Sequence, residues 1–199
     1  MTPEEKIPPE ITSEQFKQLY LVSKVIHSTL DQQEALDLII REAVRLVNAT
    51  TGSLVLINPI NGFLEIQAAY SLPEESKLKL RVGEGITGWV AQQGKSAIVQ
   101  NVHQDERYVQ VHKHTKSELA VPLEINGILS GVVNVDSEKL NAFNQNDLAL
   151  LTELTSQAAL VIHNAFLYEQ SKIRANLFET LVRVCLLYTS DAADEGLGV

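Results

Sequence analysis

The 199-residue chain alternates between two hydrophobic periodicities, and these define its predicted elements. Apolar side chains recur at spacings of three and four over residues 13–31, over 32–48 and from 144 onwards, which is typical of amphipathic helices. The residues placed to cap these three helices are Ser13, Asp31 and Asn144. Between them the chain consists mainly of short apolar runs separated by Gly, Pro and Asn, which predicts strands.

Four of the predicted strands form two hairpins. The strongest turn signal is Asn126-Gly127, because both central residues of a type I′ turn need positive φ. Pro59 and Gly62 mark the other turn. The predicted strands are 53–58 and 63–70 in the first hairpin, 118–125 and 128–136 in the second, and a short fifth strand at 97–99.

We expect an α+β fold with a central antiparallel sheet of five to six strands and helices on both faces. The chain lacks the strand–helix–strand alternation that a parallel sheet requires. Helix 32–48 and the first part of the last helix would pack on one face. A short helix over 86–93, ended by Gly94, and the loop 102–116 would cover the other. Long helices would extend both ends of the domain.

The C-terminal helical pattern continues for ~40 residues, longer than most helices of globular domains. At ~1.5 Å per residue such a helix is ~60 Å long, which is more than one small domain covers. The simplest partner for the uncovered apolar stripe is a second copy in parallel, so we expect a homodimer joined by a coiled coil. The interface candidates are Leu154, Val161, Ala165, Tyr168, Ile173, Leu177 and Leu181.

Composition narrows the classes of function. A net charge of −9 offers no basic surface for nucleic acid, whose phosphates need clustered Lys and Arg. The hydrophobic content of 45% supports a packed core, but no apolar run reaches the ~18–20 residues of a membrane span. The acidic, Pro-containing N-terminus does not resemble a secretory signal. We therefore expect a cytoplasmic protein with no membrane span and no nucleic-acid partner.

Short motifs follow one another in a fixed order between residues 81 and 147. They are VGEGITGWVAQQGK at 82–95, IVQNV at 98–102, Asp105, Tyr108, SELAVPL at 117–123, the Gly127 turn, GVVNV at 131–135, Phe143 and Asp147. In order and spacing these motifs resemble those of the GAF domain, a small sensory module of bacterial signalling proteins. The resemblance covers about residues 32–165.

The resemblance implies a signal-transduction sensor that binds a small molecule, dimerises, or does both. In GAF domains, ligands bind between the sheet and the helix and loops that cover it. An apolar cleft with a few polar anchors suits such a ligand. The residues that match this region are Trp89, Ile98, Asn101, Tyr108, Ser117, Leu119, Val121, Val133 and Asn134. Trp89 fits a core position at least as well.

No motif in the chain indicates a catalytic residue, a metal site or a cofactor. Nucleophile-elbow, His-Glu-x-x-His and P-loop sequences are missing. Some relatives of this fold reduce methionine sulfoxide or hold a bilin through cysteines, but the one cysteine here, Cys185, lies outside the domain. His103, His112 and His114 share a loop with Asp105, but their spacing is loose and neighbouring lysines disfavour a cation.

Two further ligand classes are weaker alternatives. Relatives that bind cyclic nucleotides carry an Asn-Lys…Phe…Asp-Glu signature, and Leu148 stands here in place of its final acid. The glycines of GEGITG, at 83–88, suggest a phosphate cradle, but the dinucleotide fingerprint and its strand–helix context are missing. We interpret them as a tight turn into the helix at 86–93.

We divide the chain into five parts. They are a disordered N-terminus (1–12), an N-terminal helix (13–31), the GAF domain (32–165), a C-terminal signalling helix (166–184) and a tail (185–199). The tail sequence CLLYTSDAADE resembles a translated sequencing adapter, so we interpret the natural sequence as continuing differently after Val184.

The missing continuation would hold the output domain, and this fragment itself is not expected to be an enzyme. Residues 171–184 weakly resemble the entry into an HD-GYP phosphodiesterase of cyclic di-GMP. A histidine kinase or a diguanylate cyclase output is a further alternative. In a third interpretation, the domain is an empty GAF module that serves only to dimerise.

Overall fold

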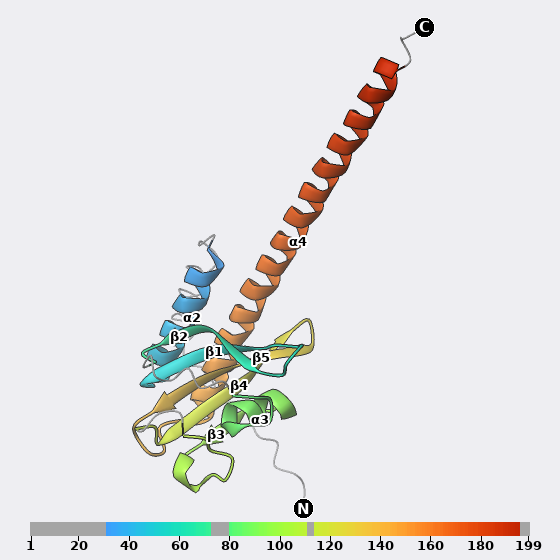
Figure 1. The fold of residues 1–199 in the computed structure, drawn as a ribbon. Helices are drawn as coiled ribbons and strands as arrows, with labels where there is room; N and C mark the ends of the chain where they lie inside the picture. The colour runs from blue at the N-terminus through green and yellow to red at the C-terminus, as the bar shows by residue number, and fades with distance from the viewer. Residues whose placement is uncertain (1–30, 73–79, 111–113, 196–199) are drawn as a thin grey trace, which may run out of the picture. The chain divides into compact units, whose positions relative to one another are not determined.

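The computed structural model describes residues 31–72, 80–110 and 114–195, with side chains as far as residue 183 (Figure 1). The predicted disorder of 1–12 and the predicted helix over 13–30 lie outside the described residues. The elements are α2 (Gln32–Leu46), β1 (Thr51–Ile57), β2 (Leu64–Tyr70), α3 (Gly85–Gln93), β3 (Ala97–Val99), the 3₁₀ turn η2 (Val102–Gln104), β4 (Ser117–Ile125), β5 (Ile128–Ser137) and α4 (Gln145–Glu195).

The five described strands form one antiparallel sheet in the order β2-β1-β5-β4-β3. The predicted α+β fold is thereby confirmed. Asn126 and Gly127 both have positive φ, 54° and 75°, as the turn between β4 and β5 requires. α2 and the beginning of α4 lie on one face of the sheet, and α3 lies on the other (Figure 1).

α2 begins at the predicted cap and ends earlier than predicted. The Asp31 side chain accepts hydrogen bonds from the backbone N–H groups of Gln33 and Glu34, which satisfies two donors that the first turn leaves unpaired. The buried side of α2 carries Ala35, Leu36, Ile39, Ile40, Ala43 and Val44. The helix stops at Leu46, because the chain turns back at Asn48, where φ is 55°.

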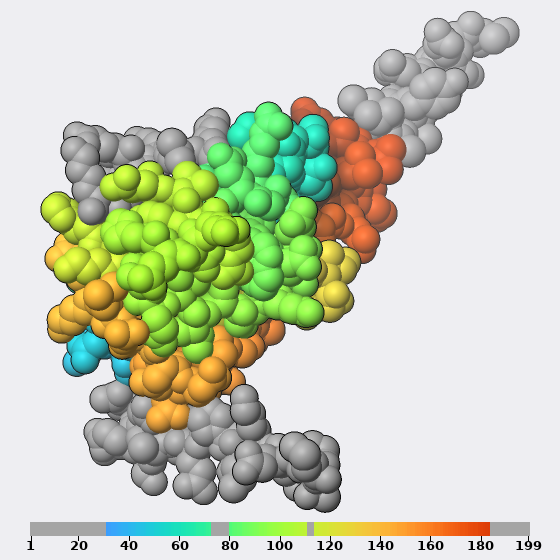
Figure 2. All heavy atoms as spheres, turned by 90° about the horizontal axis from the view of Figure 1, so that it is seen from below, coloured from blue at the N-terminus to red at the C-terminus, as the bar shows by residue number. Residues whose placement is uncertain are grey.

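α3 and the chain on either side of it cover the second face of the sheet. In the space-filling view, residues 80–110, in green, form most of the visible surface (Figure 2). Beneath them lies a buried cluster that joins Val90 and Ile86 of α3 to Val55, Ala120 and Val132 of the sheet. The resemblance to GAF domains led us to expect a ligand between this layer and the sheet.

The GEGITG segment is a tight turn into α3, as predicted. Gly83 has φ 90°, and its N–H donates to the carbonyl oxygen of Gly88 over 2.7 Å. A Cβ on Gly88 would lie 2.4 Å from the carbonyl oxygen of Arg81. Glycine is therefore required at position 88 by close backbone approach, and the turn brings the first residues of α3 against the sheet.

α4 opens with a reciprocal cap. Asn144 accepts from the N–H groups of Asn146 and Asp147, and the Asp147 carboxylate accepts from the N–H of Asn144. The chain divides into a unit that ends at Val161 and a second unit that starts at Ile162. Within the second unit, every side chain from 166 to 183 is exposed. None of the helices in the described part of the chain has the length and apolar character of a membrane span.

Candidate functional site

Two carboxylates lie opposite each other on neighbouring strands, on the face that α3 covers. Glu118 of β4 pairs with Asp136 of β5 in the strand register, and each is only 6% exposed. We call these two residues the acid pair. The Thr87 hydroxyl donates to Glu118 over 2.9 Å, and the Thr51 hydroxyl donates to Asp136 over 3.3 Å. In the described part of the chain neither carboxylate forms a salt bridge.

Burial raises the pKa of both carboxyls. It raises the pKa of Asp136 to about 7, against the opposing effect of the Thr51 hydrogen bond. The pKa of Glu118 lies well above its ordinary value, first because of burial and second because of the negative charge of Asp136. Two buried acids that repel one another do not ionise together, so the pair gains its negative charges one at a time.

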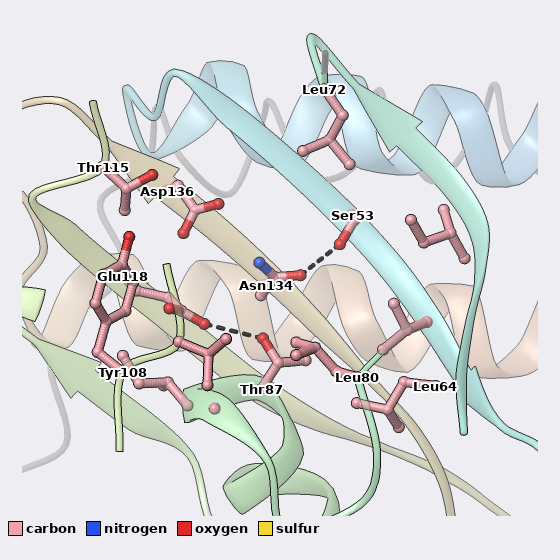
Figure 3. A pocket seen from close by; sticks show the side chains of 15 residues that line it. Ser53, Leu64, Leu72, Leu80, Thr87, Tyr108, Thr115, Glu118, Asn134 and Asp136 are labelled. Carbon is pink, nitrogen blue, oxygen red and sulfur yellow. Dashed lines mark hydrogen bonds between the residues drawn. The ribbon is translucent and has the colours of Figure 1, made fainter. Parts of the chain in front are cut away.

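A cavity of about 70 Å³ opens beside the acid pair (Figure 3). Tyr108, Thr115 and Asn134 complete its polar side. Its remaining wall is largely apolar and includes Leu64 and Leu80. An apolar wall that faces a few convergent polar groups is the usual composition of a small-molecule site, although such sites generally reach ~300–1,000 Å³.

Two side chains in the cavity are held as hydrogen-bond donors. Ser53 Oγ donates to Asn134 Oδ1 over 2.5 Å, so the amide nitrogen of Asn134 stays on the side of Asp136 (Figure 3). Burial raises the pKa of Tyr108, and the charges of Asp136 and Glu118 raise it further. Tyr108 therefore stays a neutral phenol at physiological pH. The cavity thus offers donors from one side and acidic oxygens from another.

Arg107 anchors the loop that carries Tyr108. Its Nε and Nη2 donate to the two oxygens of Asp105 over 2.8 and 2.6 Å. Its guanidinium carbon lies 4.4 Å from the ring centre of Trp89. The hydrogen bonds lower the pKa of Asp105 and raise the pKa of Arg107. Trp89 therefore packs between Arg107 and the core, and it does not line the cavity.

The other candidates from the sequence are dispersed. Tyr108 and Asn134 line the cavity. Val121 borders a groove against α4, on the opposite face of the sheet. Leu119 and Val133 share that opposite face, because Val133 pairs with Val121, and Leu119 lies two residues before Val121 on the same strand. These three residues are fully buried on the helical side, away from the cavity.

The last three candidates do not line the cavity. Ser117 is buried, and its hydroxyl donates to the carbonyl oxygen of Lys139 over 2.8 Å. Ile98 and Asn101 border a separate open groove at the surface. The Asn101 side chain accepts from the N–H of His103 and so caps η2.

The acid pair and Thr87 are candidate site residues that the sequence analysis did not single out. The signal was present, because Glu118 and Asp136 are charged residues within two largely buried and mostly apolar strands. A charged residue inside a buried strand is rare unless it is paired or functional. The hairpin turn at Asn126-Gly127 fixes the register that brings the two acids together.

The loop histidines form no cluster in the part of the chain that the structure describes. No group of three or more His, Cys, Asp or Glu side chains there is placed to hold a metal ion. The His103 ring packs edge-on against Tyr108, with ring centres 5.8 Å apart. His112 lies outside the described residues.

Known structures share this fold. The GAF domain of the Acinetobacter phosphoenolpyruvate-protein phosphotransferase matches with a TM-score of 0.70 at 22% identity, over 78% of this chain and 96% of that one. The free methionine-R-sulfoxide reductase from Neisseria meningitidis, solved in complex with its substrate, gives 0.69 at 18% identity, over 77% and 93% of the two chains. At these identities the similarity shows the fold alone.

Two curated relatives are several times longer than this chain. The "Probable 3',5'-cyclic phosphodiesterase pde-5" of Caenorhabditis elegans is 22% identical over 193 residues, 89% of this chain and 26% of that protein. The "Nif-specific regulatory protein" of Azospirillum brasilense is 28% identical over 127 residues, 59% of this chain and 20% of that protein. The chain thus spans about a quarter or less of these two relatives.

A family model described as the GAF domain matches residues 29–163, more than half of the chain. The match coincides with the sheet, with α2 and α3, and with the part of α4 that belongs to the first compact unit. The chain therefore belongs to the GAF domain family.

Proposed function

We propose that this chain is a cytoplasmic sensory module whose cavity binds a small molecule with a cationic group. The observation that carries the proposal is the acid pair, which buries two carboxylates at the cavity without a basic partner among the described residues. Such a pair is costly to keep in an empty protein. A ligand cation would supply the missing charge, and the groups that receive it are already in place.

The rest of the cavity restricts the ligand further. The apolar side chains of Leu64 and Leu80 suit a short hydrocarbon part, while Asn134 and Tyr108 can donate to an oxygen on the ligand. The cavity of about 70 Å³ holds a few non-hydrogen atoms. A larger ligand therefore requires the described cavity to widen.

The relatives support a regulatory role over a catalytic one for this segment. Some neighbours of the same fold are free methionine-R-sulfoxide reductases, but the single cysteine of this chain is Cys185, remote in sequence from the cavity residues. The hydroxyls beside Asp136 and Glu118 belong to Thr51 and Thr87, and each donates its hydrogen bond to one of the two carboxylates. We therefore assign the site to binding, without chemistry on the ligand.

The output of the sensor lies beyond α4 in this proposal. Of the two curated relatives named above, the matching segment belongs to a probable cyclic phosphodiesterase in one and to a Nif-specific regulatory protein in the other. An HD-GYP, histidine kinase or diguanylate cyclase output remains an alternative for this protein. α4 leads from the domain toward such an output, and a change in its position or register could carry the signal.

The binding proposal is tested by ligand-observed NMR with three matched probes: ethylammonium, ethanol and acetate. Ethylammonium should bind saturably, and the other two should bind at least about tenfold more weakly because they lack the positive charge. The double variant Glu118→Gln, Asp136→Asn should lose this preference. Glu124→Gln, an exposed acid on the same strand, is the control and should keep it. Equal binding of ethanol and ethylammonium would refute a cation site.

We also propose that two copies associate through the second half of α4. Tyr168, Ile173, Leu177 and Leu181 are 55–68% exposed in the single chain. Exposed apolar surface on this scale favours burial at ~25 cal/mol per Å². Of the predicted interface, Leu154 is 1% exposed and belongs to the core, while Val161 and Ala165 are half-buried. The proposed contact therefore starts near Tyr168.

Sedimentation of a charge variant tests this association. Leu177→Glu with Leu181→Glu should shift the dimer toward monomer, because each change places a carboxylate in the contact. Asn176→Glu with Thr180→Glu adds the same charge to adjacent positions of the helix and should leave the dimer largely intact. If both double variants sediment as tight dimers, the stripe is not the interface, and the module dimerises elsewhere.

A further inference from the structure

The geometry of the acid pair limits how much charge it can hold. Glu118 and Asp136 occupy directly opposed positions of two hydrogen-bonded strands, so their side chains leave the same face of the sheet. Both are buried, and each receives one hydroxyl hydrogen bond among the described contacts. Like charges at opposed positions repel, and the surrounding core screens that repulsion poorly.

The groups that face the pair do not remove this conflict. Thr87 reaches it from α3 and Thr51 from β1, and both are neutral. Tyr108 and Thr115 approach from the chain before β4, and His103 packs behind Tyr108. The nearby cation, Arg107, is already bound by both oxygens of Asp105. Its effect on Glu118 is correspondingly the smallest of those that act on that carboxyl.

We propose that the acid pair acts as one proton-holding unit, and that a ligand cation displaces a proton from it on binding. The affinity of the cavity for its ligand would then depend on pH, because the empty site and the occupied site differ by one bound proton. This inference rests on the proposed function, since it describes how the cation site is regulated. The displaced proton leaves to solvent, and the ligand's positive charge takes its place beside Asp136.

The direction of the coupling follows from the order of ionisation. The second proton of the pair leaves only against the negative charge that the loss of the first has created. Below about pH 7 the empty pair is neutral and must release a proton to receive the cation. Affinity for a permanently charged ligand should therefore rise up to ~tenfold per pH unit below neutrality and level off above it.

The test uses the full chain labelled with ¹³C at the Asp and Glu carboxyl carbons, titrated with and without ethylammonium. Alkylammonium groups stay charged from about pH 5 to about pH 8, so the probe itself does not titrate. Glu118→Gln and Asp136→Asn assign the two signals. We expect the pair to release its first proton near neutrality and its second at higher pH, and ethylammonium to shift the first release to lower pH.

The single variants provide a readout that a purely structural role would not change. In Asp136→Asn, the Glu118 titration should move to lower pH, because the repelling charge has gone. In Glu118→Gln, the Asp136 titration should move little, because burial, more than Glu118, sets it. Glu124→Gln should change neither signal.

Two results would overturn the inference while the proposed binding still stood. One is that both carboxyls titrate at ordinary values near pH 4, and the other is that ethylammonium binds with the same affinity from about pH 5 to about pH 8. If ethylammonium fails to bind at any pH although the carboxyls titrate as expected, then the cation half of the inference is wrong, together with the proposed function.

Discussion

The substitution Asp136→Asn should stabilise this protein at neutral pH, although it removes a buried charged residue from a candidate site. Asparagine has nearly the same shape as aspartate, and its carbonyl oxygen can still accept from Thr51. What disappears is the cost of ionising a buried acid. In the unfolded chain an aspartate ionises near pH ~3.9, whereas burial raises the pKa of Asp136 in the folded protein to about 7.

The sign and size of the effect follow from this difference. Because the folded-state pKa is raised, the unfolded state binds fewer protons between about pH 4 and about pH 7, and stability falls as pH rises through that window. The slope is about 1.4 kcal/mol per pH unit, so Asp136 costs roughly 4 kcal/mol once it is fully ionised. Glu118 acts in the same direction in both proteins, and the loss of the Asp136 charge reduces its cost further in the variant.

Urea unfolding of wild type and Asp136→Asn at about pH 5, 6 and 7 measures this contribution. The difference in unfolding free energy between the two proteins should grow by roughly 2 kcal/mol from pH 5 to pH 7, in favour of the variant. Glu124→Gln, an exposed acid of β4, should show a difference that hardly depends on pH. If the Asp136→Asn difference is also constant with pH, then Asp136 is not a buried acid with a raised pKa.

Two further predictions concern the framework of the site. Gly131→Ala should cost about 3 kcal/mol in urea unfolding, because its Cβ would lie 2.1 Å from the carbonyl oxygen of Val55. Gly127→Ala should cost about 1 kcal/mol, because its Cβ would meet nothing within 4 Å but its φ is 75°. Equal costs would contradict the close approach of β1 and β5. Arg107→Ala should change the fluorescence emission of Trp89, the one tryptophan of the chain, because the guanidinium lies over its ring. The same variant should lower the free energy of unfolding by about 1 kcal/mol. An unchanged emission spectrum would mean that Arg107 does not stack on the ring in solution.

The fold was predictable because its signals are local and mutually consistent. Asp31 and Asn144 cap the helices that the periodicity defines, and Asn126-Gly127 sets the register of β4 against β5. The deviations are confined to element ends. α2 stops before the predicted end, where Asn48 adopts positive φ, a conformation that Asn tolerates but periodicity does not reveal.

The site was harder to predict, because which face of a strand a residue occupies depends on tertiary structure. Leu119, Val121 and Val133 lie near the acid pair in sequence, but they alternate with it and so point to the helical side of the sheet. In β4 and β5 the polar residues Glu118, Asn134 and Asp136 all lie on the cavity face, and apolar residues alternate with them. The pattern separates the two faces of the strands, but which face holds the cavity depends on how α3 packs against the sheet.

The central claim, that the cavity is a receptor for a cationic small molecule, is tested most directly by native mass spectrometry. The full chain would be purified from cells at about pH 7.5 without added ligand, beside the Glu118→Gln, Asp136→Asn double variant, so that Asp136 is ionised in the wild type. We predict that the wild type carries a dissociable extra mass, identifiable as a cationic compound after release, and that the double variant has the bare protein mass. An extra mass that is anionic, or that persists in the double variant, would contradict the account.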